Sequence, residues 1–556
     1  MKAWKIHKSL TKTNINERQD EIIKTLLSLR ELKTKAQINR FFNPINPTRL
    51  SGKDVGINTS QLNKTISRLG RAIKTKQPVV VYGDYDADGI CATAILWEIL
   101  HKLGAKTLPF IPHRKKHGYG ISQKGIDQIL KDHKPSATGH QPLIITVDNG
   151  IVAHDAVKYA TSKKLEVIIT DHHVKSKTLP PAYSFVHTTK LSGSGVSWFL
   201  ANALAKRLKT KAPKNLELAA IGSVADMVPL LDANREVVAR GLDQLHATRR
   251  LGLLQLFKQA GVEAESISTY EINFIIAPRL NAMGRLGHAL DSLRLICTLS
   301  ESRAEKLATK LSATNKDRQQ LTQDQVAHAH QSLGRSVNKQ SILIVSSQKY
   351  HEGVIGLIAG RLMERYSRPT IVLSKGKTHS KASARSIPGF NIIQSLREVE
   401  DLLVDVGGHP MAAGFTVENK KINALTRKLQ KIADKKINAK LLQKSISIDC
   451  QVELTDINQK LFESIEKFAP FGVSNRKPIF ATRKVEVAEA RTVGAENKHL
   501  KLSLRQKKRL FPAIGFNLGK KISGLSTGDK VDIAYTIDEN TWNGRKNLQL
   551  IIKDLK

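Results

Sequence analysis

The length and charge of the chain limit its function. It has 556 residues, and its 89 lysines and arginines exceed its 49 aspartates and glutamates, which gives a formal net charge of +40. This surplus favours a polyanionic partner, and we expect nucleic acid, although a general bias toward surface lysine would also produce it. No apolar run approaches the ~18–20 residues that a membrane span needs, which excludes a membrane-spanning protein.

The composition also predicts the compartment. The three cysteines, Cys91, Cys297 and Cys450, are far apart and form no C-x-x-C pair, which argues against a disulfide framework or a thiolate zinc site. The first residues carry no secretory apolar segment. We therefore expect a cytoplasmic protein of roughly three to four domains.

The first part of the chain, residues 1–75, has a polar and mostly helical pattern without recognisable chemistry. From residue 76 to about residue 229 the pattern then alternates strand, loop and helix, which predicts a parallel sheet, and we assign residues 76–298 to this α/β domain.

The most informative stretch is an apolar, β-branched run at residues 79–82 that ends in a loop with Asp84, Asp86 and Asp88. The run predicts a strand buried on both faces, and a helix is expected to follow. Three crowded carboxylates repel one another unless a cation neutralises them, and Mg²⁺ or Mn²⁺ suits such ligands. An EF-hand is excluded because its twelfth position requires Glu, and Ile95 stands there.

Three later apolar runs end in similar residues. The run at 143–147 precedes Asp148, the run at 165–170 precedes Asp171, His172 and His173, and the run at 221–225 precedes Asp226. Because the carboxyl ends of parallel strands meet at one edge, we expect one crevice lined by Asp86, Asp88, Asp148, His172 and Asp226. Two metal ions there could share a bridging carboxylate and act on a phosphodiester, and Asp148 is our candidate for the bridge. Asp171 is expected to orient an imidazole.

Two basic segments are candidate phosphate contacts. Arg114 and Tyr119 lie in a basic, glycine-containing loop that suits a strand's backbone and a stacked base, although a solvated loop fits nearly as well. Arg279 and Arg285 could bind phosphate oxygens or form surface ion pairs.

The remaining sequence predicts three further parts. Residues 299–337 form a long connecting helix, residues 338–443 a second, smaller α/β domain, and residues 444–556 a β-barrel of OB type. In the last part, Asn543-Gly544 is a hairpin signal and interleaved cations suit single-strand binding, but a plain structural barrel would show the same pattern. The fold class is therefore α/β, with two α/β domains joined by a long helix and followed by a barrel.

The motifs together resemble a known family. Tyr-Gly-Asp-Tyr-Asp-Ala-Asp-Gly, Asp-Asn-Gly, Asp-His-His and Val-Ala-Asp, in this order, look like the DHH phosphoesterase superfamily, and within it most like the RecJ exonucleases. The segments at 277–285, 351–356, 383–386 and 407–414 continue the resemblance, the last three as a DHHA1-type domain. One departure is the short segment 187–193, where we expect an Asn-Pro and a longer loop.

The resemblance implies roles for residues. It gives the metal positions as Asp84, Asp86, Asp88, Asp148, His172 and Asp226, with two Mn²⁺ or Mg²⁺ ions. It gives His173, Arg279 and His409 as catalytic residues near the scissile phosphate. The residues expected to bind the strand are Arg114, Tyr119, Asn281, Arg285, Ser383 and Arg385.

The resemblance also implies an activity. It is exonuclease cleavage of single-stranded DNA from the 5′ end, which releases mononucleotides in DNA repair and recombination. The implied partners are a helicase and a single-strand-binding protein, and we expect a monomer. Two alternatives stay open: a phosphodiesterase for short oligonucleotides, cyclic dinucleotides or pyrophosphate, and an inactive strand-binding homologue.

Overall fold

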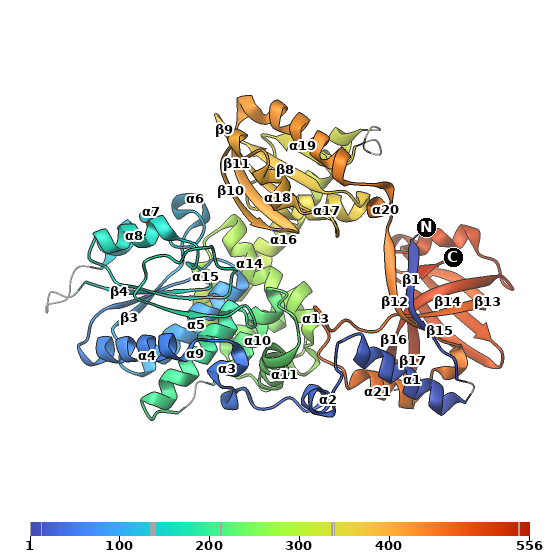
Figure 1. Cartoon of the computed structure of the whole chain (residues 1–556). Helices are drawn as coiled ribbons and strands as arrows, with labels where there is room; N and C mark the ends of the chain where they lie inside the picture. Colours follow the sequence, from blue (N-terminus) through green and yellow to red (C-terminus); the bar gives the residue numbers. More distant parts are fainter. Residues whose placement is uncertain are drawn as a thin grey trace. The chain divides into compact units, whose positions relative to one another are not determined.

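The computed structural model describes residues 2–12, 14–133, 141–211, 214–334, 337, 340–542 and 545–556, and it divides into two compact units (Figure 1). Unit 1 comprises Met1–Ile45, Pro229–Arg235 and Gln443–Lys556, and unit 2 comprises Asn46–Val228 and Glu236–Leu442. Within these described ranges, no helix has both the length and the apolar character for crossing a bilayer. Cys91 and Cys450 are buried and Cys297 is partly buried; all three are free thiols.

A five-stranded parallel sheet forms the first half of unit 2, as the apolar runs predict. Its order is β3-β2-β4-β5-β6, and every neighbouring pair is parallel. The central strands are buried on both faces, and their residues are mostly β-branched, as is typical of a parallel sheet covered on both sides. The strands are β2 (Val79–Tyr82), β3 (Thr107–Phe110), β4 (Leu143–Val147), β5 (Val167–Asp171) and β6 (Ser184–His187).

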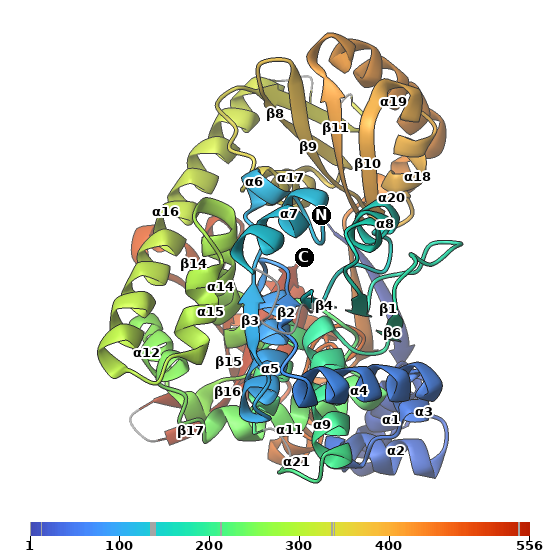
Figure 2. The same ribbon diagram turned by 90° about the vertical axis from the view of Figure 1, so that its left-hand side faces the viewer.

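Helices cover both faces of this sheet (Figures 1 and 2). On one face, α5 (Ala87–Lys102) and α9 (Gly193–Arg207) pack together, with α10 (Leu216–Ala225) against both. Helix α4 (Thr59–Lys74) packs on β6 and α9, on the same face as α5. On the other face, α7 (Gln123–Asp132) and α8 (His154–Ser162) enclose an apolar core. Short helices α3 (Gly52–Val55) and α6 (Arg114–His117) complete this part.

The apolar run before Asp226 is a helix and not the strand that we expected. Residues 216–225 form α10, whose side chains are almost all buried between α5 and α9. A buried helix of apolar residues and a buried strand have the same composition, so periodicity could not separate them. Asp226 therefore lies at the C-terminal end of a helix.

A helical region and one long helix follow. The helices are α11 (Asp232–His246), α12 (Leu251–Ala260), α13 (Thr269–Glu271), a π-helical turn (Ile272–Ile276), α14 (Ala277–Leu286), α15 (Leu290–Cys297) and α16 (Glu301–Leu333). The expected long helix is confirmed in α16, which contacts α12, α14 and α15 and also β7 and α17 (Figure 2).

The second sheet of unit 2 is mixed, with the order β10-β11-β9-β8-β7. Only β7 and β8 pair in parallel. Helices α16 and α17 share one core with this sheet, and α18 and α19 share another. The elements are β7 (Leu343–Ser347), α17 (Ile355–Tyr366), β8 (Thr370–Lys375), β9 (His379–Arg385), α18 (Ile392–Arg397), β10 (Leu403–His409), β11 (Ala412–Glu418), α19 (Ile422–Lys436) and α20 (Ala439–Leu442).

Unit 1 is built on the expected barrel. Strands β13-β14-β15-β17-β16 follow one another and β16 pairs with β13, which closes five strands. The strands are β12 (Ser445–Gln451), β13 (Phe480–Val493), β14 (His499–Gln506), β15 (Arg509–Gly515), β16 (Lys530–Trp542) and β17 (Arg545–Leu555). The expected turn at 543–544 lies outside the described residues. Helices α1 (Ile15–Ser28), α2 (Lys35–Phe42) and α21 (Gln459–Glu466) contribute to the barrel's core.

The N-terminal segment differs from the helical stretch that we expected. Strand β1 (Ala3–Ser9) pairs in parallel with β12, and the indole N–H of Trp4 donates to Asp554 at 2.8 Å. Residues 1–45 belong to unit 1, whereas α4 belongs to unit 2. The strand was missed because its apolar alternation includes only Trp4 and Ile6, and Lys8 takes the next position on the same face.

Candidate active site

The aspartate loop connects β2 to α5. Asp86 is the N-cap of α5, and its carboxylate accepts the N–H of Gly89 at 3.0 Å. Asp84 is buried, and its Oδ1 accepts the N–H of Tyr85 at 2.7 Å. Local hydrogen bonds thus fix two carboxylates at the carboxyl end of a parallel strand.

Asp88, in the first turn of α5, is fixed by another helix. Its Oδ2 accepts the N–H of Gly193 at 2.7 Å and its Oδ1 accepts the N–H of Ser194 at 3.0 Å, at the start of α9. A Cβ on Gly222 would lie 2.2 Å from Oδ1 of Asp88. The free N–H groups of a helix start thus orient this carboxylate, and a glycine of α10 leaves space for it.

Asp148 follows β4 and is buried in a left-handed conformation, with φ of +62°, which Asp tolerates better than most residues. Its Oδ1 accepts no hydrogen bond and lies 3.1 Å from Nε2 of His172. A Cβ on Gly193 would lie 2.4 Å from this oxygen, so no larger residue fits beside it. A buried carboxylate oxygen without a donor is suited to coordinate a cation.

His172 connects the carboxylates. Its Nε2 lies 3.5 Å from Oδ2 of Asp226 and 4.0 Å from Oδ2 of Asp88. Asp226 reaches the group from the C-terminal end of α10. The structure therefore brings together every expected metal position, including the one that follows a helix.

The ligand atoms form three overlapping groups in which all atoms lie within 4.8 Å of one another. Asp148 belongs to two of them, which suits a carboxylate shared by two cations. The groups are Asp84, Asp86 and Asp148; Asp88, His172 and Asp226; and Asp148, His172 and His173. Carboxylate oxygens with one or two imidazole nitrogens fit Mn²⁺ or Mg²⁺.

Burial and mutual repulsion raise the pKa values of these carboxyl groups. The pKa of Asp84 rises to about 8 through burial and the charge of Asp86, and that of Asp226 to about 8 through burial and the charge of Asp88. The pKa values of Asp86 and Asp148 are also raised, chiefly by burial. Burial lowers the pKa of His172 and so favours the neutral imidazole that binds metals. The cluster thus needs protons or cations to relieve its charge.

Asp171 orients His173, as the sequence predicted for this carboxylate. Its Oδ1 lies 2.7 Å from Nδ1 of His173 and accepts the N–H of His172 at 2.7 Å, while its Oδ2 accepts the N–H of Ile151 at 2.9 Å. Burial lowers the pKa of His173, but the hydrogen bond and charge of Asp171 outweigh it and raise the pKa to about 9. The imidazole of His173 is therefore protonated on both nitrogens at neutral pH, with Nδ1 on Asp171 and Nε2 pointing away from it.

Two further histidines contact His173. Its carbonyl lies 2.7 Å from Nε2 of His187, in the short segment that departs from the family pattern. His409, on β10, stacks on its ring with centroids 6.4 Å apart and planes at 11°. The second sheet thus brings the expected His409 to the metal cluster.

Three arginines expected to bind the strand lie near one another. The charges of Arg114 and Arg385 add to burial in lowering the pKa of Arg285 to about 10. Nη1 of Arg385 donates to Ser383 at 3.2 Å, and Arg114 lies over the ring of Tyr85, 4.1 Å from its centroid. Among the described residues, none of the three guanidinium groups forms an ion pair with a carboxylate. Such a group favours an anionic ligand.

Two residues of α14 have positions that differ from expectation. Asn281, expected to bind the strand, accepts the N–H of Ala87 at 2.7 Å and so holds the aspartate loop. Arg279, expected to be catalytic, donates to the carbonyl of Ile275 at 2.7 Å, and only burial affects its pKa. It lines a groove of about 560 Å³ with Gln259, Thr309, Ser312, Ala313, Asn315, Lys316 and Gln319, without any metal-cluster residue.

The position of Arg279 follows from helix geometry. At ~100° per residue, Arg285 is ~40° from Asn281 and ~240° from Arg279 around α14. Asn281 and Arg285 share a face, whereas Arg279 points elsewhere. The structure places Arg279 on another side of α14 from Asn281 and Arg285, and its catalytic role stays a prediction.

Tyr119 lies at the edge of the cluster. Its hydroxyl is 3.5 Å from Nε2 of His173, and its ring packs edge-on against Tyr85, with centroids 6.0 Å apart. The ring is 58% exposed, so one face remains available to a base.

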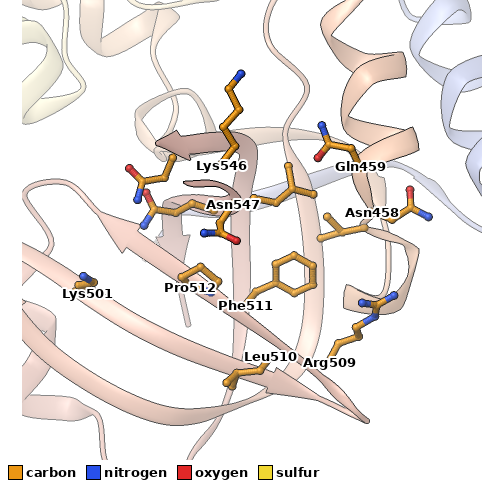
Figure 3. A pocket seen from close by; sticks show the side chains of 13 residues that line it. Asn458, Gln459, Lys501, Arg509, Leu510, Phe511, Pro512, Lys546 and Asn547 are labelled. Atoms are coloured by element: carbon orange, nitrogen blue, oxygen red, sulfur yellow. The ribbon is translucent and has the colours of Figure 1, made fainter. Parts of the chain in front are cut away.

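The barrel carries a groove of about 720 Å³ (Figure 3). Phe511 and Asn547 border it, and Lys501, Arg509 and Lys546 add cations. Its other lining residues are Ile457, Asn458, Gln459, Leu510, Pro512, Asn540, Leu548 and Gln549. Aromatic, amide and cationic groups together suit a single strand.

Comparison with known proteins identifies the family. Residues 78–223 match the N-terminal domain of the DHH family, residues 339–436 the DHHA1 domain and residues 448–554 the RecJ OB domain. The single-stranded-DNA-specific exonuclease RecJ of Salmonella typhimurium is 30% identical over 530 residues, covering 89% of this chain and 90% of that protein. The chain belongs to the RecJ family.

Other RecJ proteins are similar to this chain as well. The Bacillus subtilis RecJ is 35% identical over 506 residues, which cover 89% of this chain but 63% of that longer protein. The crystal structure of Thermus thermophilus RecJ in complex with Mn²⁺ matches with a TM-score of 0.81 and 28% identity, over 100% of this chain and 79% of that one. The complex of the same protein with Mg²⁺ matches with a TM-score of 0.77 and 26% identity, over 100% and 78%.

Several residues that shape the site were not predicted from the sequence. Gly193 and Gly222 leave space for Asp148 and Asp88, and His187 supports His173. Asn149 accepts the N–H of Ile121 at 3.1 Å and so holds the segment after Tyr119. The Gly-Ser-Gly start of α9 was the available signal, because glycines before an apolar helix indicate a close approach.

Proposed function

We propose that this chain is an exonuclease that degrades single-stranded DNA from its 5′ end and releases mononucleotides. Membership of the RecJ family confirms the expected enzyme class, a metal-dependent exonuclease. The observation that carries the proposal is the convergence of five aspartates and a histidine from separate elements on one cluster, in which Asp84, Asp88 and Asp148 are buried.

Two Mn²⁺ or Mg²⁺ ions fit this cluster, and its residues divide between them. Asp84, Asp86 and Asp148 would hold the first ion, and Asp88, His172 and Asp226 would hold the second. Asp148 belongs to two of the three groups, and it is our candidate for the shared ligand. The Thermus thermophilus RecJ structures contain these same ions. When bound, the cations supply Lewis acidity and neutralise charge during phosphodiester hydrolysis.

The chain's other residues bind and orient the strand. His173, held by Asp171 through Nδ1, donates a hydrogen bond from Nε2 to a non-bridging oxygen of the scissile phosphate. His409, stacked beside it, contacts the same phosphate. Arg114, Arg285 and Arg385 bind the 5′-terminal phosphate, whose charge matches their unpaired guanidinium groups.

The barrel holds the rest of the strand in the groove of Figure 3. The net charge of +40 favours a long polyanion over a dinucleotide. We also propose that the chain acts as a monomer, that a helicase supplies its single strands, and that a single-strand-binding protein presents them. Co-sedimentation with such proteins would test the last two points.

The decisive assay uses strands labelled at the 5′ or the 3′ end, as single strands and as duplexes, with Mn²⁺ or EDTA. We expect mononucleotides from the 5′ end of single strands with Mn²⁺ only. Faster cleavage of dinucleotides would favour the short-substrate alternative, and binding without cleavage in Mn²⁺ would favour the inactive homologue.

A further inference from the structure

The residue after Asp226 combines an uncommon backbone with an exposed apolar side chain. Met227 has φ of +60° and is 62% exposed. Its N–H donates to the carbonyl of Val224 at 3.1 Å, and the N–H of Val228 donates to the carbonyl of Ser223 at 3.3 Å. This is a Schellman motif, whose left-handed residue is usually glycine. Methionine is disfavoured there, and packing against the chain does not explain it.

Other helix ends of the chain show the contrast. Among the described residues, the same pair of hydrogen bonds ends seven further helices, and the left-handed residue in each is glycine or a charged residue: Glu31, Gly56, Lys76, Gly104, Lys164, Lys209 and Gly261. Glycine removes the backbone strain, and a charged side chain at such an exposed position is solvated by water. Met227 is apolar, unlike all seven, so its side chain needs another explanation.

Four other exposed apolar side chains follow or contact the site. Val174 comes directly after His173, Met411 comes two residues after His409, and Val152 lies in the loop after Asp148. With Tyr119 and Met227, these side chains are 45–63% exposed, and we call the five the apolar rim. Each of the five lies within four residues of a site residue in the chain or contacts one, and exposed apolar side chains beside a charged site indicate a ligand surface.

We propose that Met227 and the apolar rim contact the nucleobase next to the scissile phosphate. The inference rests on the proposed function, because it names what a strand's terminal nucleotide would contact. Apolar contact makes no hydrogen bonds to base edges, so it accepts every base. The flexible, polarisable thioether of methionine adapts to bases of different size. Met227 thus positions the substrate from the residue next to the metal ligand Asp226.

The test compares Met227→Gly with the wild type on two 5′-phosphorylated strands. One strand carries normal bases, and the other carries abasic residues at its two 5′-terminal positions. Glycine relieves the left-handed strain, so we expect the Tm to rise while kcat/KM on the normal strand falls about tenfold. On the abasic strand, wild type and variant should differ by less than about twofold.

Lys209→Gly is the matched control, because it changes the same position of the same motif at the end of α9. It should raise the Tm and leave kcat/KM unchanged on both strands. Mn²⁺ affinity of Met227→Gly, measured by calorimetry, should equal that of the wild type.

Three results would overturn the inference. The first is an equal loss of kcat/KM on both strands, and the second is an unchanged kcat/KM on the normal strand. The third is a lower Mn²⁺ affinity of Met227→Gly, which would mean that the substitution acts through Asp226. A wild-type protein that cleaves neither strand would refute the proposed function itself and this inference with it.

Discussion

Asp171 is the residue on which the orientation of His173 depends. Its two oxygens accept backbone N–H groups and contact Nδ1 of His173. Asp171→Asn replaces one acceptor by an N–H₂ group, so at least one of these bonds is lost. We expect kcat to fall about 10- to 100-fold with a smaller change in KM, measured by steady-state cleavage of a labelled strand.

The exposed Asp155, in the first turn of α8, offers a control. Asp155→Asn removes the same charge outside the site and should leave kcat unchanged. If Asp171→Asn also keeps its wild-type kcat, His173 does not act in the way we describe.

At this scale the sequence predicts ligands better than the residues that make room for them. Asp86, Asp148 and His172 were predicted because each stands where a parallel strand ends. Gly193 and Gly222 were not, because their role depends on which helix packs against which aspartate. That information lies in tertiary contacts between segments about 50 to 130 residues apart.

Helix α14 separates two residues that the sequence placed in one motif. Asn281 accepts the N–H of Ala87 and holds the aspartate loop, whereas Arg279 lies on another side of the helix. Asn281→Ala leaves that buried N–H unpaired, which costs about 1–3 kcal/mol and loosens the loop. We expect weaker Mn²⁺ binding and a kcat reduced at least about tenfold.

Arg279→Ala serves as the comparison for this variant. It should keep kcat within about threefold of the wild type, since no metal-cluster residue lies in its groove. If kcat falls more in Arg279→Ala than in Asn281→Ala, measured in parallel, the result would support the catalytic role that the family resemblance implies for Arg279.

Elements with a distinctive composition and length were predicted, and elements without one were not. The central strands are short β-branched runs that end in a polar loop, and helix α16 is a long polar stretch rich in helix-forming residues. Helix α10 resembled a strand because nearly all of its residues are apolar. Strand β1 was missed because its partner β12 lies more than 400 residues later, and local pattern carries no information about it.

The charge of the whole molecule makes strand binding depend on salt. Each phosphate contact contributes roughly −0.7 to the slope of log affinity against log salt for a single strand. Replacing Lys501, Arg509 and Lys546 by alanine should therefore reduce the slope by up to about 2, measured from KM on a long strand.

On a DNA strand of only a few nucleotides, the salt slope should be the same for the barrel variant and the wild type. Alanine at Lys158, Lys163 and Lys164 removes the same charge from unit 2 and is the control. An unchanged slope in the barrel variant would mean that its groove does not hold the strand.

The central claim, that buried carboxylates and an imidazole hold a pair of cations, is tested most directly by calorimetric titration of the EDTA-treated protein with Mn²⁺. The account predicts two ions per chain for the wild type. For Asp148→Asn, which tolerates the same left-handed backbone, it predicts the loss of at least one ion or an affinity reduced about 100-fold. Fewer than two ions in the wild type, or an unchanged titration in Asp148→Asn, would contradict it.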